Sequence, residues 1–168
     1  MTKKKNILIT NDDGFEAIGI KHLVEALKPI ANVYVVAPDR NQSACGHSMT
    51  LNRPLKLASF DDDSYTIDGT PTDCVFVSLH TLFDTCKPDL LVSGINIGSN
   101  MGEDITYSGT VAAAMEAVLH KVPAIAISQV YNNLHSNENK NDWDFTLAKQ
   151  TIVEVATKIL DGGFPLGE

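Results

Sequence analysis

The stretch that decides the fold is Asn6-Ile7-Leu8-Ile9-Thr10-Asn11-Asp12-Asp13-Gly14. Its Ile-Leu-Ile run is typical of a short strand that is buried on both faces, as in the middle of a parallel sheet. The run ends in two adjacent carboxylates and a glycine. Because ligands of open α/β sheets bind outside the carboxyl ends of the strands, we expect Asp12 and Asp13 to lie at a ligand-binding edge.

The acidic pair Asp12-Asp13 has two interpretations. Neighbouring side chains on a strand point to opposite faces, so the two carboxylates converge only if the chain has left the strand, and Gly14 permits the turn that this requires. Two carboxylates held together repel unless a cation neutralises them, and Mg²⁺ or Mn²⁺ prefers such oxygen ligands. Asn-Asp-Asp-Gly is also an ordinary turn and helix-capping sequence. The stretch alone leaves both interpretations open.

Length and composition favour one globular domain over residues 1–168. A chain of 168 residues with 43% hydrophobic residues is long enough to bury a single core. The sequence contains no run of about 18 apolar residues, so no transmembrane helix is predicted. The basic start Met1–Lys5 is followed by an apolar run too short for a signal peptide, so we expect a cytoplasmic protein that does not bind a membrane.

The charge and the cysteines exclude two classes of function. Acidic residues outnumber basic ones 21 to 13, a net charge of −8, which argues against binding a nucleic acid polymer. A small anionic substrate stays compatible if a bound cation reverses the local field. The three cysteines form no C-x-x-C pair, so neither a disulfide framework nor a zinc site is predicted.

The order of the predicted elements indicates a parallel sheet. A helical stripe of apolar residues at Ile20, Leu23, Val24 and Leu27 separates the first strand from a second apolar run at 32–38. This strand–helix–strand unit favours an α/β fold: a Rossmann-like three-layer sandwich with a mainly parallel sheet. Later segments predict two more buried strands and two helices: strands at 89–93 and 123–128, a helix at 111–119, and a final helix from near Asp142 or Asp144.

Residues 51–67 differ from this pattern. Their alternation predicts a β-hairpin or arm beside the main sheet, with an exposed acidic turn at Asp61–Asp63. The next segment opens a helix, because Thr70 is a suitable N-cap, Pro71 suits the first helical position and Asp73 suits the first turn.

Polar side chains gather where the predicted strands end. Asp12-Asp13 follows the first strand, Ser43 lies in the loop after the second, and Asn96 follows the third. Ser108-Gly109-Thr110 precedes a nearly apolar helix, whose N-terminus is either an anion site or a plain hydroxyl cap.

With these segments in order, the sequence resembles the SurE (stationary-phase survival protein) family of metal-dependent nucleotidases from Ile7 to about Gln129. Five motifs carry the resemblance: ITNDDG at 9–14, APDRNQS at 37–43, DGTPTDC at 68–74, SGINIGSN at 93–100 and YSGTVAAAMEA at 107–117.

The resemblance implies a divalent-metal-dependent phosphomonoesterase that hydrolyses nucleoside 5′- and 3′-monophosphates, with one Mg²⁺ or Mn²⁺ per subunit. It implies a homodimer or homotetramer for the full-length family. It also implies the roles of the site residues, which are catalytic Asp12, Asp13 and Asn96, the metal ligands Asp12, Asp13, Ser43 and Asn96, and the phosphate-binding residues Asn96, Ser108, Gly109 and Thr110. These ligands all present oxygen, which disfavours zinc.

The sequence departs from the family in two places. Ala44 stands where the family usually has glycine, which matters if the backbone there takes a positive φ. The chain stops at Glu168, whereas the family continues, so we expect the C-terminal strand and the oligomerisation arm to be absent. No residue is identified as proton donor to the leaving group; His47 is a candidate by position alone.

Two alternatives belong to other classes of function. A phosphoacceptor signalling domain needs an aspartate at the end of its central strand, but the third and fourth strands here end in Ser93-Gly94 and Ser128-Gln129. A covalent aspartyl phosphatase needs D-x-D, which Asn11-Asp12-Asp13 does not supply. A non-catalytic metal- or nucleotide-binding module stays open.

Overall fold

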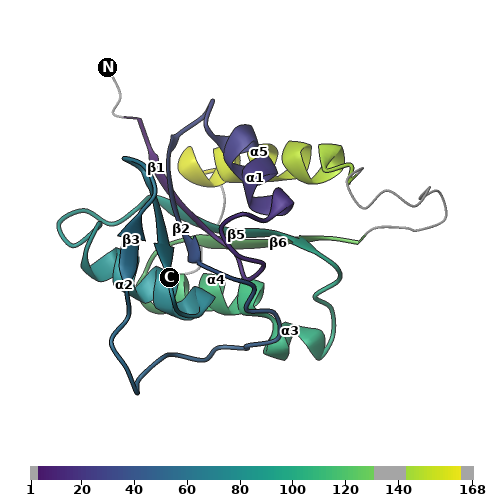
Figure 1. Cartoon of the computed structure of the whole chain (residues 1–168). Coiled ribbons are helices and arrows are strands. Elements are labelled where there is room, and N and C mark those ends of the chain that lie inside the picture. The colour runs from purple at the N-terminus through teal and green to yellow at the C-terminus, as the bar shows by residue number, and fades with distance from the viewer. Residues whose placement is uncertain (1–3, 131–142, 164–168) are drawn as a thin grey trace.

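The computed structural model describes residues 4–130 and 143–163, which form an α/β fold with six strands and five helices in those ranges. Strands and helices alternate along much of the chain (Figure 1). The elements are β1 (Asn6–Thr10), α1 (Ile18–Leu27), β2 (Asn32–Pro38), β3 (Leu57–Ser59), β4 (Ser64–Ile67), α2 (Pro71–His80), β5 (Leu90–Ile97), α3 (Asp104–Tyr107), α4 (Gly109–Leu119), β6 (Ala124–Gln129) and α5 (Thr146–Leu160).

The sheet has the order β3-β4-β2-β1-β5-β6. Every pair in it is parallel except β3 with β4, so the mainly parallel sheet is confirmed. The hairpin predicted within 51–67 is present as β3 and β4. It does not lie beside the sheet, because β4 pairs with β2 and extends the sheet at that edge.

Two layers of helices bury the sheet, as the three-layer prediction requires. Helices α1 and α5 lie on one face of the sheet in Figure 1, and α2 and α4 lie on the other. Strand β1 contributes to both cores, since Ile7 and Ile9 point into the first and Leu8 into the second, and all three are 0% exposed. The strand buried on both faces is therefore confirmed.

The position of β1 in the sheet is the point at which the chain connections diverge. The chain leaves β1 through α1 to reach β2 on one side, and later returns as β5 on the other side, where Thr10 pairs with Ser93. Connections that diverge from neighbouring strands open a crevice at their carboxyl ends, which is where open α/β sheets bind ligands.

The ends of two helices test the predicted caps. Helix α2 begins as expected: the Thr70 hydroxyl accepts the Asp73 N–H at 3.1 Å, and the Asp73 carboxylate accepts the Thr70 N–H at 2.9 Å. Helix α5 begins at Thr146, whose N–H donates to the Asp144 carboxylate at 2.8 Å. Residue 142, the other predicted start, lies outside the described residues.

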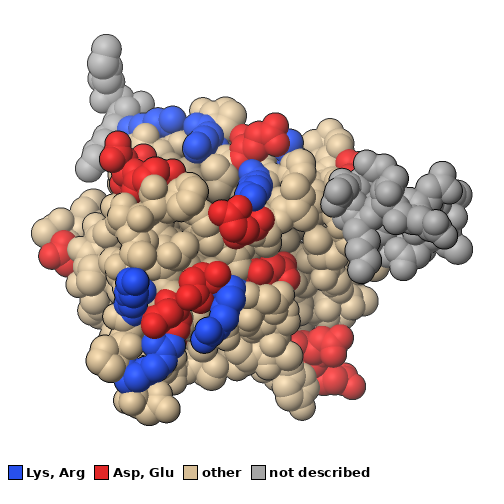
Figure 2. Space-filling model, viewed as in Figure 1, with Lys and Arg blue, Asp and Glu red and all other residues tan. Residues whose placement is uncertain are grey.

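The surface is mixed in charge. On the face shown in Figure 2, Lys and Arg side chains lie among Asp and Glu side chains, and the described residues form no continuous basic patch there. Ion pairs such as Lys5–Asp89 at 2.9 Å and Arg53–Asp68 at 2.8 Å account for part of this mixing. Within the described residues, no helix is long and apolar enough to cross a membrane.

The contact between α1 and β5 depends on Gly19. A Cβ atom on Gly19 would lie 2.0 Å from the carbonyl oxygen of Ile95, so only glycine allows the helix to approach the strand. We expect Gly19→Ala to lower the free energy of unfolding by at least about 2 kcal/mol, the scale of overpacking, although alanine favours helix. Urea unfolding measures this loss.

The matched control is Gly163→Ala, because a Cβ there would meet only the Lys158 carbonyl oxygen at 3.5 Å. It should change the free energy of unfolding little. Equal stability of the Gly19 variant and the unaltered chain would contradict the close approach.

Candidate functional site

Asp12 lies just beyond the carboxyl end of β1 and is held by the start of α4. It is 4% exposed and follows β1 by two residues. Its Oδ1 accepts the Thr110 hydroxyl at 2.7 Å, and its Oδ2 accepts the Thr110 backbone N–H at 3.2 Å. The first turn of a helix offers free N–H groups and the positive end of the dipole, so this position stabilises a carboxylate.

The two residues before Thr110, Ser108 and Gly109, allow this contact and cap the helix. A Cβ atom on Gly109 would lie 2.8 Å from the Cβ of Asp12 and 2.9 Å from the Cys45 sulfur, so a larger residue would push the acidic turn away. The Ser108 hydroxyl accepts the Val111 N–H at 3.2 Å and caps the helix. The phosphate-binding roles of Ser108, Gly109 and Thr110 stay predictions.

The surroundings of Asp13 disfavour the charged form of its carboxyl group. Burial, followed by repulsion from the Asp12 carboxylate, raises the pKa of Asp13 from 3.8 to about 6. Among the described residues, neither carboxylate forms an ion pair with a Lys, Arg or His side chain. The turn at Gly14, with φ +101°, holds the two carboxylates together. A bound cation would offset their repulsion.

The loop that carries Ser43 runs beside Asp12. The Gln42 N–H donates to the Asp12 backbone carbonyl at 2.7 Å, and the Ser43 N–H donates to the Asn41 side chain at 2.9 Å. Ser43 is exposed. The backbone contact therefore brings the residue before Ser43 to the acidic turn.

Asn96 lies within β5, near its end, on the strand next to β1. The predicted strand end at Ser93 was too early, because β5 continues to Ile97. The register of β5 with β6 shifts between Ser93 and Asn96, which places one extra residue on β5. Such bulges re-aim side chains at strand ends. The Asn96 Nδ2 donates to the Gly98 carbonyl at 3.2 Å, and its amide oxygen is the atom that a hard cation takes.

The structure therefore joins some of the predicted site residues directly and others only by their place at this edge. Asp12 touches Thr110, and Gly109 closely approaches it. No contact between Asp12 or Asp13 and the side chains of Ser43 or Asn96 occurs among the hydrogen bonds of the described residues. The donor set is all oxygen and suits a hard divalent cation, and the four-residue ligand set stays a prediction.

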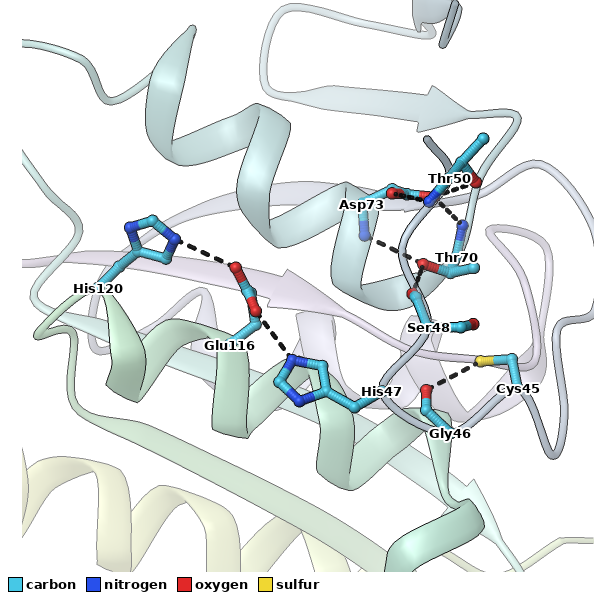
Figure 3. Close-up of polar contacts among 9 residues, drawn as sticks. All are labelled: Cys45, Gly46, His47, Ser48, Thr50, Thr70, Asp73, Glu116 and His120. Carbon is cyan, nitrogen blue, oxygen red and sulfur yellow. Dashed lines mark hydrogen bonds and ion pairs between the residues drawn. The ribbon is translucent and has the colours of Figure 1, made fainter. Parts of the chain in front are cut away.

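Sequence reasoning missed a buried carboxylate that binds two partly exposed histidines (Figure 3). Glu116, on the nearly apolar helix α4, is 5% exposed and hydrogen bonds to His47 at 2.8 Å and to His120 at 3.1 Å. A single carboxylate at a buried helix position is the signal that could have found it. The ring of His47, the candidate proton donor, thus binds Glu116 through Nε2.

The family model described as "Survival protein SurE" matches residues 7–166. The chain belongs to the SurE family. The crystal structure of the SurE protein from Aquifex aeolicus superposes with a TM-score of 0.84 at 45% identity, covering 95% of this chain and 62% of that one. The likeness to this SurE structure confirms the fold class.

Two curated relatives named 5′-nucleotidase SurE are similar over nearly the whole chain. That of Aliarcobacter butzleri is 62% identical over 166 residues, or 98% of this chain, and that of Sulfurovum sp. is 55% identical over 168 residues, or 99%. This chain spans 63% of the length of each.

Ala44, which stands where the family usually has glycine, adopts a backbone conformation with positive φ. Its φ is +60°, in the left-handed region that disfavours a Cβ atom. We expect Ala44→Gly to raise the free energy of unfolding by about 0.5–1 kcal/mol, since strain relief exceeds the added chain entropy. Chemical denaturation measures the gain; destabilisation by the substitution would show that the turn is not strained.

The pKa of Asp13 predicts a pH dependence of stability. Its folded pKa of about 6 exceeds the usual 3.8, so the folded carboxyl binds its proton more tightly. The resulting stabilisation is complete below pH 3.8 and is lost as the pH rises through about 6. We expect Asp13→Asn to stabilise the metal-free chain at neutral pH and to lose this advantage in acid.

Urea unfolding in the presence of a chelator, repeated across that pH range, measures the difference between Asp13→Asn and the unaltered chain. A difference that does not change with pH would contradict the raised pKa.

Proposed function

We propose that this chain carries the catalytic site of a divalent-metal-dependent phosphomonoesterase that hydrolyses nucleoside 5′- and 3′-monophosphates to nucleoside and phosphate. The observation that carries the proposal is the contact of Asp12 with Thr110, which joins the acidic turn to a helix N-terminus. An anion site and a cation site then share one edge of the sheet. The relatives named 5′-nucleotidase support the substrate class.

The proposed roles follow from the chemistry of each group. Asp12, Asp13, Ser43 and Asn96 would hold one Mg²⁺ or Mn²⁺ per subunit. When bound, such an ion offsets negative charge on the phosphate and lowers the pKa of a coordinated water.

The chain's own groups would complete the reaction. Asp12 is fixed by two hydrogen bonds from Thr110, so its position needs no reorganisation during turnover. Asp13 is less buried and would orient the attacking water. Asn96 would touch the phosphate, and Ser108 and Gly109 would cradle its oxygens at the start of α4. The hydroxyl and the N–H of Thr110, the third predicted phosphate-binding residue, donate to Asp12, so Thr110 would act by holding that carboxylate.

The wider setting is also proposed. Residues 1–168 would form one domain of a cytoplasmic enzyme of the kind that, in the full-length family, is a homodimer or homotetramer. The mixed surface charge of Figure 2 supports a small-molecule substrate over a nucleic acid polymer.

Release of phosphate from nucleoside monophosphates tests the function. We expect turnover with Mn²⁺ or Mg²⁺ and none with a chelator. Asp12→Asn should lower kcat by at least about 100-fold, the scale on which loss of one preorganised electrostatic group acts. An unaffected rate would remove Asp12 from the mechanism.

Asp84→Asn is the matched control, because Asp84 is exposed and lies between α2 and β5. It should leave kcat unchanged. Circular dichroism confirms that each variant is folded. Metal-dependent nucleotide binding without any phosphate release would favour the non-catalytic binding module instead.

A further inference from the structure

Glu116 is a buried carboxylate with two histidine partners. Its Oε2 accepts the His47 Nε2 at 2.8 Å, and its Oε1 accepts the His120 Nε2 at 3.1 Å. Figure 3 shows the two rings at opposite ends of the carboxylate. Because a buried charge is costly unless it is hydrogen bonded, these contacts keep Glu116 inside the protein.

The two histidines differ in what they join. His120 is the C-cap residue of α4 and lies four residues after Glu116, so their contact is local to one helix. His47 lies 69 residues away in sequence, in the loop that follows β2. Of the two hydrogen bonds to Glu116, that of His47 is therefore the one that connects α4 to a distant segment of the chain.

The segment that His47 connects is the Ser43 loop, defined here as residues 39–50. Two backbone contacts hold its first part at the site: the Gln42 N–H donates to the Asp12 carbonyl at 2.7 Å, and the Gly46 N–H donates to the Tyr107 carbonyl at 2.9 Å. Ser43 itself is exposed, so the contacts around it must fix its position.

A second buried carboxylate holds the far end of the Ser43 loop. Asp73 of α2 is 1% exposed and accepts both the Thr50 N–H at 2.9 Å and the Thr50 hydroxyl at 2.7 Å. The Thr70 hydroxyl donates to the Ser48 carbonyl at 2.7 Å (Figure 3). Along the loop, His47 lies between the anchors at Ser48 and Thr50 and the part of the loop at the acidic turn, and its side chain contacts Glu116 of α4.

We propose that Glu116 is a positioning residue for the metal site: through His47 it holds the Ser43 loop against α4, which keeps the part of the loop that carries Ser43 at the acidic turn. The inference rests on the proposed metal role of Ser43. Groups that orient metal ligands typically change metal affinity 10- to 100-fold when they are removed.

A titration of the 168-residue chain with Mn²⁺ tests this without relying on turnover. Electron paramagnetic resonance measures the concentration of the free ion during the titration. His47→Asn places its amide too close to the backbone to reach Glu116, and we expect Mn²⁺ to bind about 10-fold more weakly. His47→Gln places its amide nitrogen where Nε2 lies, so it should restore the affinity to within about twofold.

His120→Asn is the matched control. It removes the other hydrogen bond to the same carboxylate and leaves the Ser43 loop untouched, so the Mn²⁺ affinity should change less than about twofold. Equal losses in the His47→Asn and His120→Asn variants would mean a general effect on α4 and would overturn the proposal.

A double-mutant cycle shows whether His47 acts through Glu116. Glu116→Gln combined with His47→Asn should bind Mn²⁺ no more weakly than His47→Asn alone, whereas additive losses would overturn the proposal. Intact binding by the His47→Asn chain would overturn this inference only. Failure of the unaltered chain to bind Mn²⁺ would overturn the proposed function as well.

Discussion

The site depends on one contact, the pair of hydrogen bonds from Thr110 to the Asp12 carboxylate. These residues are 98 positions apart in sequence, and the contact forms only because β1 and β5 are neighbours and α4 follows β5. Gly109 permits the approach by lacking a Cβ atom. The whole α/β arrangement therefore acts as the support for one buried carboxylate at the start of one helix.

The electrostatics of this edge are only half balanced. The N-terminus of α4 offsets the charge of Asp12, but Asp13 has no comparable partner among the described residues. Burial, followed by repulsion from Asp12, raises the pKa of Asp13 to about 6. The two adjacent residues therefore differ. Asp12 is fixed by the fold, whereas Asp13 carries an electrostatic repulsion that a divalent cation would remove.

Features set by neighbouring residues could be predicted from the sequence, and features set by distant ones could not. The buried strand β1, the helix that follows it and the Thr70 N-cap of α2 are local, and the structure confirms them. The Asp12–Thr110 and His47–Glu116 contacts join distant segments, and no periodicity encodes them. The pairing of β4 with β2 was missed because a strand's residues do not specify which distant strand it will pair with.

The central position of β1 has a consequence for the order of folding. Its pairing with β2 closes a short loop, whereas its pairing with β5 brings Ile7 to Leu90 across much of the chain. Loop-closure entropy makes the second event slower. The first strand–helix–strand unit can assemble early during synthesis, but its two carboxylates lack their partner Thr110 until α4 has left the ribosome. Capture of the proposed cation would therefore belong to the late stage of assembly.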